Sequence, residues 1–224
     1  MSYLAGLMAT AALLAPQDAP PIFQPGAPGQ PSRIITADQA LALARTSYTA
    51  EDVQFMQHMI VHHAQAVEMV GLLETQGENS RVKLLGRRIA LSQEAEMELM
   101  RSWLIARDQS TEMQMDHSGH GMDHGSMDHS AHAGHAMAPS ETPLMPGMLS
   151  PAQMARLAAA RGNEFDRLFL TGMIQHHQGA IDMVGELLEH PDAGRDTLLS
   201  DFTNSVVADQ STEILRMQSL LSDL

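Results

Sequence analysis

Two pairs of adjacent histidines, His62-His63 and His176-His177, are the residues best suited to carry chemistry in this 224-residue chain. The second pair follows the first by 176 − 62 = 114 residues, and methionines and small apolar residues surround both. Neutral imidazole nitrogen binds many transition metals, and thioether sulfur binds soft ones such as Cu(I). Each pair is therefore a candidate metal site, although histidines and methionines at this spacing can also simply fill a core.

The segments around the two pairs have the spacing of an amphipathic helix, with candidate residues at i, i+3, i+4, i+7, i+10, i+11 and i+14. In the first segment these positions are Met59, His62, His63, Ala66, Met69, Val70 and Leu73. The second segment repeats them as Met173, His176, His177, Ala180, Met183, Val184 and Leu187. Adjacent residues lie about 100° apart around a helix axis, so one imidazole of each pair can reach across to a partner helix.

A glutamate is predicted to face each histidine pair from the helix that follows it. The spacing i, i+7, i+14 relates Ile89, Glu96 and Trp103, and also Val206, Glu213 and Leu220. A carboxylate on an apolar stripe is costly unless it is paired or binds a metal. Each glutamate could bind a metal directly, or accept an imidazole N–H and fix the histidine tautomer, with or without a metal. The candidate ligands of the two repeats are His62, His63, His176, His177, Met59, Met69, Met173, Met183, Met100, Met217, Glu96 and Glu213.

The segment between the repeats is rich in histidine and methionine. It is of low complexity from Met113 to Met148, and Met-Asp-His occurs three times, so we expect no packed core there. Its candidate ligands are His117, His120, His124, His129, His132, His135, Met115, Met122 and Met127. Imidazole does not discriminate between copper, zinc and nickel, whereas thioether sulfur favours Cu(I). We therefore predict copper ions, Cu(I) or Cu(II), with zinc or nickel possible at the linker; the alternative is a merely flexible spacer.

Cap signals at matching positions predict two copies of one helical unit. Thr36 with Gln39 and Ser150 with Gln153 are capping-box pairs, again 150 − 36 = 114 residues apart. In the first copy they predict a short helix over 36–45, a long helix from 49 to about 75 and a return helix from about 82 to 108. We expect Gly172 and Gly179 in the second long helix to allow close helix packing, and we interpret His190, next to Pro191 in a turn, as structural or incidental.

The predicted fold class is all-α. Two antiparallel hairpins with apolar faces can bury those faces on each other, which gives a four-helix bundle in which each hairpin is preceded by a short helix. The expected divisions are a signal-like or disordered segment over 1–32, a first repeat over 33–109, a disordered linker over 110–149 and a second repeat over 150–224. Both repeats are expected to pack as one bundle.

Composition limits the classes of partner. The formal net charge of −14 repels a phosphate backbone, so nucleic acid is not an expected partner. The chain has no cysteine, which excludes thiolate metal sites and suits an oxidising compartment. The apolar run from Leu4 to Ala15 is too short to span a bilayer and resembles part of a secretory signal. We predict an exported protein of the periplasm or cell surface, with no transmembrane segment in the mature chain.

The two histidine blocks and the return helices resemble one family. Met59-x-x-His62-His63 and Met173-Ile-x-His176-His177-Gln-Gly-Ala, with Gln93-x-x-Glu96 and Gln210-x-x-Glu213 on the return helices, are similar to the family called domain of unknown function 305. The resemblance covers residues 36–109 and 150–224. It implies a ferritin-like helical bundle, export, and copper binding through Met and His as in some members. The long His/Met linker departs from the family pattern.

Three functions remain open at this point. The first is a binding protein that sequesters or buffers copper and contributes to copper tolerance or homeostasis. The second is a dinuclear redox enzyme of ferritin-like type; the chain has no Glu-x-x-His motif, which argues against di-iron chemistry but not against copper redox. The third is a helical interaction module that binds no metal. We favour the binding protein over an enzyme, and we expect metal ions as its partners.

Overall fold

A computed structural model describes residues 21–24, 31–37, 39–40, 47–113 and 139–224 of the chain. It divides the chain into two compact units, residues 1–46 and 47–224, which are described separately. The apolar run Leu4–Ala15, most of the first short helix and residues 114–138 of the linker lie outside the described residues. The first capping box is present, because Thr36 Oγ1 accepts from the Gln39 backbone N–H at 3.2 Å.

The first unit contains a small antiparallel pair of strands, β1 (Ile22–Gln24) and β2 (Arg33–Ile35), with Ile22 opposite Ile35. This corrects the expectation of an unstructured segment before residue 33. Apolar Ile and Phe residues flank a segment rich in Pro and Gly, and this pattern suits a hairpin. Strands of three residues are too short for alternation of polar and apolar residues to reveal them.

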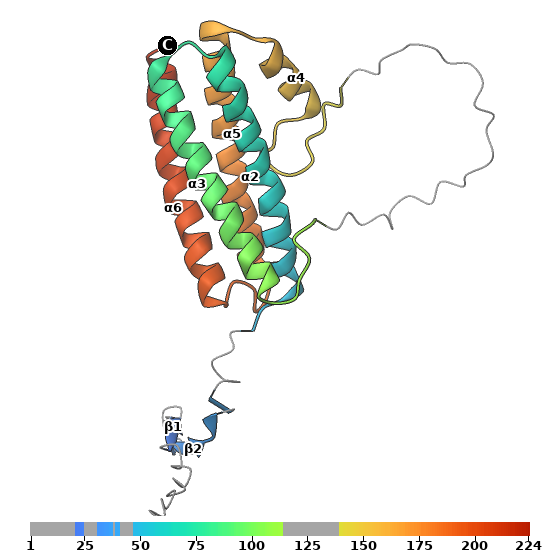
Figure 1. Cartoon of the computed structure of the whole chain (residues 1–224), viewed down its shortest axis with the longest axis vertical. Coiled ribbons are helices and arrows are strands. Elements are labelled where there is room, and N and C mark those ends of the chain that lie inside the picture. Colours follow the sequence, from blue (N-terminus) through green and yellow to red (C-terminus); the bar gives the residue numbers. More distant parts are fainter. Residues whose placement is uncertain (1–20, 25–30, 38, 41–46, 114–138) are drawn as a thin grey trace, which may run out of the picture. The chain divides into compact units, whose positions relative to one another are not determined.

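The second unit is an all-α helical bundle, as predicted (Figure 1). Its four long helices are α2 (Ala50–Gln76), α3 (Ser80–Ile105), α5 (Gly162–Glu189) and α6 (Thr197–Ser222), and the short helix α4 (Pro151–Ala159) precedes α5. Helices α2 and α3 form one hairpin, α5 and α6 form the other, and α2 packs on α5. None of the helices among the described residues is long and apolar enough to cross a membrane.

Side-chain caps begin α2, α3, α4 and α6, and those of α2 and α4 lie where the sequence predicts them. Thr49 and Asp52 form a capping box at the start of α2, and Ser150 and Gln153 form one at the start of α4. Each box satisfies backbone N–H groups that a helix start leaves without partners. Asp196 caps α6 by accepting from the Leu199 N–H at 3.1 Å.

Two buried aspartates at equivalent positions join the hairpins to each other. Asp52 on α2 accepts a hydrogen bond from the Gly194 N–H in the turn of the second hairpin, at 2.8 Å. Asp166 on α5 accepts from the Asn79 N–H in the turn of the first hairpin, at 2.7 Å. The start of each long helix thus binds the turn of the other hairpin, so the two hairpins are joined at both ends of the bundle.

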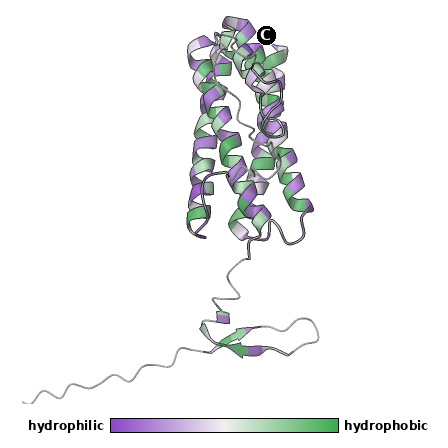
Figure 2. Cartoon of the chain, turned by 90° about the vertical axis from the view of Figure 1, so that its right-hand side faces the viewer, coloured by the Kyte–Doolittle hydropathy of each residue, from purple (hydrophilic) through white to green (hydrophobic). Residues whose placement is uncertain are grey.

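Two apolar clusters fill the bundle, one on each side of a polar layer. The first includes Phe55, Met56, Met59, Met100, Trp103, Met183, Phe202 and Val206. The second includes Ala66, Met69, Leu73, Ile89, Phe165, Phe169, Met173 and Met217. Figure 2 shows hydrophobic and hydrophilic residues interleaved along every long helix, so that each helix has an apolar face to bury.

Candidate metal centre

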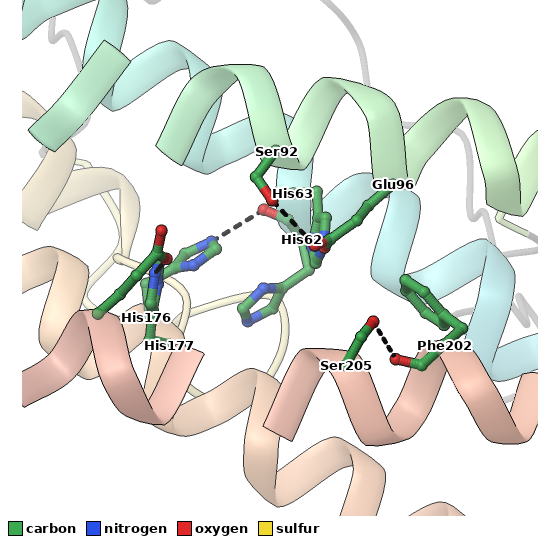
Figure 3. A network of polar contacts seen from close by, with 9 residues as sticks. His62, His63, Ser92, Glu96, His176, His177, Phe202 and Ser205 are labelled. Atoms are coloured by element: carbon green, nitrogen blue, oxygen red, sulfur yellow. Dashed lines mark hydrogen bonds and ion pairs between the residues drawn. The ribbon is translucent and has the colours of Figure 1, made fainter. Parts of the chain in front are cut away.

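The four paired histidines lie in the polar layer between the two apolar clusters. Helix α2 carries His62 and His63, and helix α5 carries His176 and His177 (Figure 3). All four are completely buried. Because α2 and α5 pack on each other, the two pairs that are 114 residues apart in sequence meet in the interior.

One histidine of each pair binds the glutamate of its own hairpin. His63 Nε2 lies 2.6 Å from Glu96 Oε2, and His177 Nε2 lies 2.6 Å from Glu213 Oε2. This is the pairing that the spacing of the return helices predicts. The glutamate side chains are not fully buried, at 15% and 20% exposed, so one edge of each carboxylate meets solvent. Ser92 Oγ also donates to Glu96 Oε1, at 3.2 Å.

The other histidine of each pair binds a backbone carbonyl. His62 Nε2 donates to the carbonyl oxygen of Pro146 at 3.0 Å, and His176 Nε2 donates to that of His62 at 2.8 Å. The centres of the His62 and His176 rings are 3.9 Å apart at an angle of 44°. This confirms the prediction that one imidazole reaches the partner helix, and it brings the two pairs into direct contact.

These contacts place a proton on Nε2 of all four histidines, because carbonyl and carboxylate oxygens only accept hydrogen bonds. In the neutral form of each ring, Nδ1 then carries the lone pair. None of the four buried Nδ1 atoms has a hydrogen-bond partner among the described residues. Histidines that bind metals commonly donate their other N–H to a carboxylate or a carbonyl, which is the arrangement found here. Nδ1 is thus the ring nitrogen through which each of these histidines would bind a metal.

Burial keeps the central imidazoles neutral. Desolvation, with a smaller effect from neighbouring His63, lowers the pKa of His62 to about 3. Desolvation followed by the proximity of His62 lowers the pKa of His176 well below its usual range. Both rings are therefore unprotonated at neutral pH, as ligation requires.

We expect the metal-free protein to lose stability as the pH falls from 7 to 5. The pKa of His62 is lowered on folding, so its stabilising contribution is present above the unfolded pKa of about 6.5 and is lost below it. At about 1.4 kcal/mol per pH unit, His62 alone should cost about 2 kcal/mol by pH 5, and His176 acts in the same direction. Urea unfolding at both pH values measures this, and His62→Gln should reduce the dependence. Equal stability at pH 7 and pH 5 would contradict it.

The six predicted methionine ligands are all buried, but they are divided between the two sides of the polar layer. Met59, Met100 and Met183 belong to one apolar cluster, and Met69, Met173 and Met217 belong to the other. Among the described residues, no three His, Asp or Glu side chains form a group that could hold one ion. The donors of the bundle therefore come as histidine pairs with methionines above and below them.

A segment that the sequence assigns to the disordered linker covers the histidines. Residues 145–149, which we call the strap, follow the undescribed part of the linker and lead into α4; Met145, Met148 and Leu149 are buried. Gln65 on α2 holds the strap with two bonds, donating to the Leu149 carbonyl at 2.9 Å and accepting from its N–H at 2.7 Å. The strap was not predicted because it adjoins a segment of low complexity. The apolar run Met-Pro-Gly-Met-Leu is the sequence feature that indicates it.

Gly179 allows the backbone of the strap to pack closely against α5. A Cβ atom at this position would lie 2.3 Å from the Pro146 carbonyl oxygen and 2.4 Å from the Gly147 Cα. Gly147 itself has a φ of 75°, which favours glycine. The prediction that Gly179 allows another helix to pack closely is wrong, because the segment that approaches it is the strap, which is not helical. At Gly172 the nearest atoms belong to the side chains of Leu149 and Met69.

The structure does not test the candidate ligands of the linker. His117, His120, His124, His129, His132, His135, Met115, Met122 and Met127 all lie outside the described residues. They remain predictions from the sequence.

The fold and the buried histidine layer define a helical-bundle protein with paired imidazoles at its centre. The chain belongs to the family described as domain of unknown function (DUF305), whose sequence pattern matches residues 52–221. This confirms the resemblance carried by the histidine blocks. Comparison with curated proteins finds no match.

Solved structures share the bundle. A DUF305 fragment from Deinococcus radiodurans is 29% identical, with a TM-score of 0.60 over 79% of this chain and 99% of that one. A DUF305 protein from Streptomyces coelicolor is 24% identical, with a TM-score of 0.59 over 77% and 93% of the two chains. CopM in its Cu(II)-bound form is also 24% identical, with a TM-score of 0.54 over 77% and 96%. At the two lower identities, the likeness concerns the fold.

Proposed function

We propose that this protein binds copper, as Cu(I) or Cu(II), and sequesters or buffers it in support of copper tolerance or homeostasis. The observation that carries the proposal is the set of four buried Nδ1 atoms without a hydrogen-bond partner among the described residues, each on a histidine whose Nε2 is already held by an oxygen acceptor. An unsatisfied buried nitrogen costs about 1–3 kcal/mol. Four such atoms in one layer are more readily explained by a ligand than by packing.

The donor set favours a soft cation. Hard cations such as Mg²⁺ and Ca²⁺ take several oxygen ligands, whereas the described residues offer no cluster of carboxylates and histidines for them. Paired imidazoles flanked by thioethers suit Cu(I), and imidazole with carboxylate suits Cu(II). CopM structures carry the names of Cu(I)-bound and Cu(II)-bound forms, which supports copper as the metal for this chain.

The His/Met-rich linker and the compartment complete the proposal. In this function the imidazole and thioether groups of the linker capture ions, and the bundle holds them more tightly. The structural relative from Streptomyces coelicolor is named a candidate secreted protein, which supports export. No separate observation favours the redox enzyme or the interaction module, so binding is the one function that we propose.

Replacing His62, His63, His176 and His177 with glutamine should remove the tightest copper site from the full chain. We expect at least a tenfold loss in Cu(I) affinity, because the Nδ1 donors are gone while side-chain volume and polarity are approximately kept. Titration of Cu(I) and Cu(II) against competing chelators measures the affinity, and circular dichroism and urea unfolding establish that the variant folds.

A second variant separates the bundle from the linker. Serine in place of the six linker histidines should lower the number of ions bound but leave the tightest affinity unchanged. If the glutamine variant retains the tightest site and the serine variant loses it, the proposed bundle site is wrong. Nitrogen NMR of the unsubstituted chain should show metal-induced shifts at Nδ1 rather than at Nε2.

A further inference from the structure

A groove of about 340 Å³ opens outside the buried centre, between the start of α2, the end of α5 and the strap. Among the residues that line it, six carry groups that can attract or bind a cation: Glu51, His58, Met145, Met183, Glu186 and His190. They come from three segments that are far apart in sequence. The fold alone brings them together.

The groove offers two imidazoles and two thioethers. Met145 and Met183 are almost fully buried, whereas His58 is half-buried and its pKa is lowered by desolvation. Backbone and Thr49 side-chain hydrogen bonds at the start of α2 lower the pKa of Glu51, one of the two carboxylates that line the groove with His190. The groove thus combines imidazole nitrogen and thioether sulfur donors with two carboxylates.

The duplicated sequence shows that these groups are particular to one end of the bundle. At the offset of 114 residues, Phe165 stands for Glu51 and Gly172 stands for His58 in the second repeat. In the other direction, 186 − 114 = 72 and 190 − 114 = 76, so Leu72 and Gln76 stand for Glu186 and His190. The equivalent helix positions near the other end of the bundle therefore lack all four of these ionisable groups, and Phe165 and Gly172 there are buried.

The groove is also next to the buried histidines. Pro146 lines the groove, and its carbonyl oxygen accepts the hydrogen bond from His62 Nε2. The strap therefore forms the wall between the groove and the interior. A cation in the groove would lie on the outer side of Pro146, whose carbonyl oxygen accepts the hydrogen bond from His62 on the inner side.

We propose that the groove is a second metal site, which binds a soft monovalent cation through His58, His190, Met145 and Met183, with Glu51 and Glu186 attracting the ion. The cation must be soft, because no three His, Asp or Glu side chains among the described residues can share an ion, and thioether sulfur is needed to complete the site. This inference deepens the proposed copper binding, on which it rests, by adding an outer site of the same chemistry.

The test follows the methionine methyl groups of the full chain by NMR during titration with Ag(I), a redox-inert probe for Cu(I). Met145→Leu and Met183→Leu assign the two groove resonances, since a swap of Met for Leu keeps the volume nearly constant. We expect both resonances to shift together as Ag(I) is added. Met154→Leu, on α4 and away from the groove, is the matched control and should leave both shifts unchanged.

The double variant His58→Ala/His190→Gln tests the imidazoles; the glutamine that it introduces corresponds to Gln76 of the other repeat. We expect it to weaken the Ag(I) response of Met145 and Met183 at least tenfold, while the linker methionines respond as before. Two results would overturn the proposal: groove resonances that stay unmoved at saturation, or an equal response in the double variant.

The outcomes for the two metal sites are separate. If Met145 and Met183 respond but the four-glutamine variant keeps its tightest affinity, the buried site fails and the groove stands. If the histidine Nδ1 atoms respond and the groove methyl groups do not, the groove fails and the proposed function stands.

Discussion

Replacing Asp196 with alanine should lower the free energy of unfolding by about 3–5 kcal/mol, as expected when one partner of a buried ion pair is removed. The Asp196 side chain is 1% exposed and pairs with the Arg107 guanidinium. It also accepts from Trp103 Nε1 at 3.0 Å and caps α6 through the Leu199 N–H. The substitution would leave a largely buried guanidinium, an indole N–H and a helix start without their acceptor.

Urea unfolding of the two proteins measures this loss. Asp223→Ala is the matched control, because Asp223 also pairs with an arginine, Arg81, at the other end of α6. That pair is exposed on both sides, at 61% and 46%, so its loss should cost no more than about 1 kcal/mol. Similar losses for the two substitutions would show that the buried contacts of Asp196 do not stabilise the fold more than an exposed ion pair does.

Gly179→Ala should destabilise the protein by about 3 kcal/mol and detach the strap. The new Cβ would lie within 2.4 Å of strap backbone atoms, which cannot move aside as a flexible side chain would. Displacement of the strap would also take away the Pro146 carbonyl from His62. Urea unfolding measures the loss of stability. Faster hydrogen exchange at the Leu149 amide, which donates to Gln65 Oε1, would show that the strap has detached.

Gly185→Ala on the same helix provides the control. No atom lies within 4 Å of a Cβ at this position, so alanine meets open space. Its better helix propensity should stabilise the protein by up to about 1 kcal/mol. A Gly179→Ala protein with unchanged stability and an equally protected Leu149 amide would rule out tight packing of the strap on α5.

Local signals made the helices predictable. Helix α2 begins after the Thr49 capping box and ends at Gln76, before Gly77, close to the predicted range of 49 to about 75. Helix α3 ends at Ile105, three residues before the predicted Asp108, because a helix end without a strong stop signal is read less reliably. The short strands, by contrast, carry too little pattern to be found.

The sequence by itself determined the bundle, its duplication and the inward faces of the histidines and methionines, because helical periodicity and caps act between neighbours along the chain. It also predicted that Glu96 and Glu213 face the imidazoles, since positions seven apart share a helix face. These features require no knowledge of what lies across the interior.

Only the tertiary structure decided which nitrogen of each imidazole is free and how the methionines divide around the layer. Those features depend on partners far away in sequence: the Pro146 carbonyl lies 84 residues from His62, and the His62 carbonyl lies 114 residues from His176. Helical spacing specifies a face but not the atom opposite it. The strap and the groove follow for the same reason, because each exists only where separate segments meet.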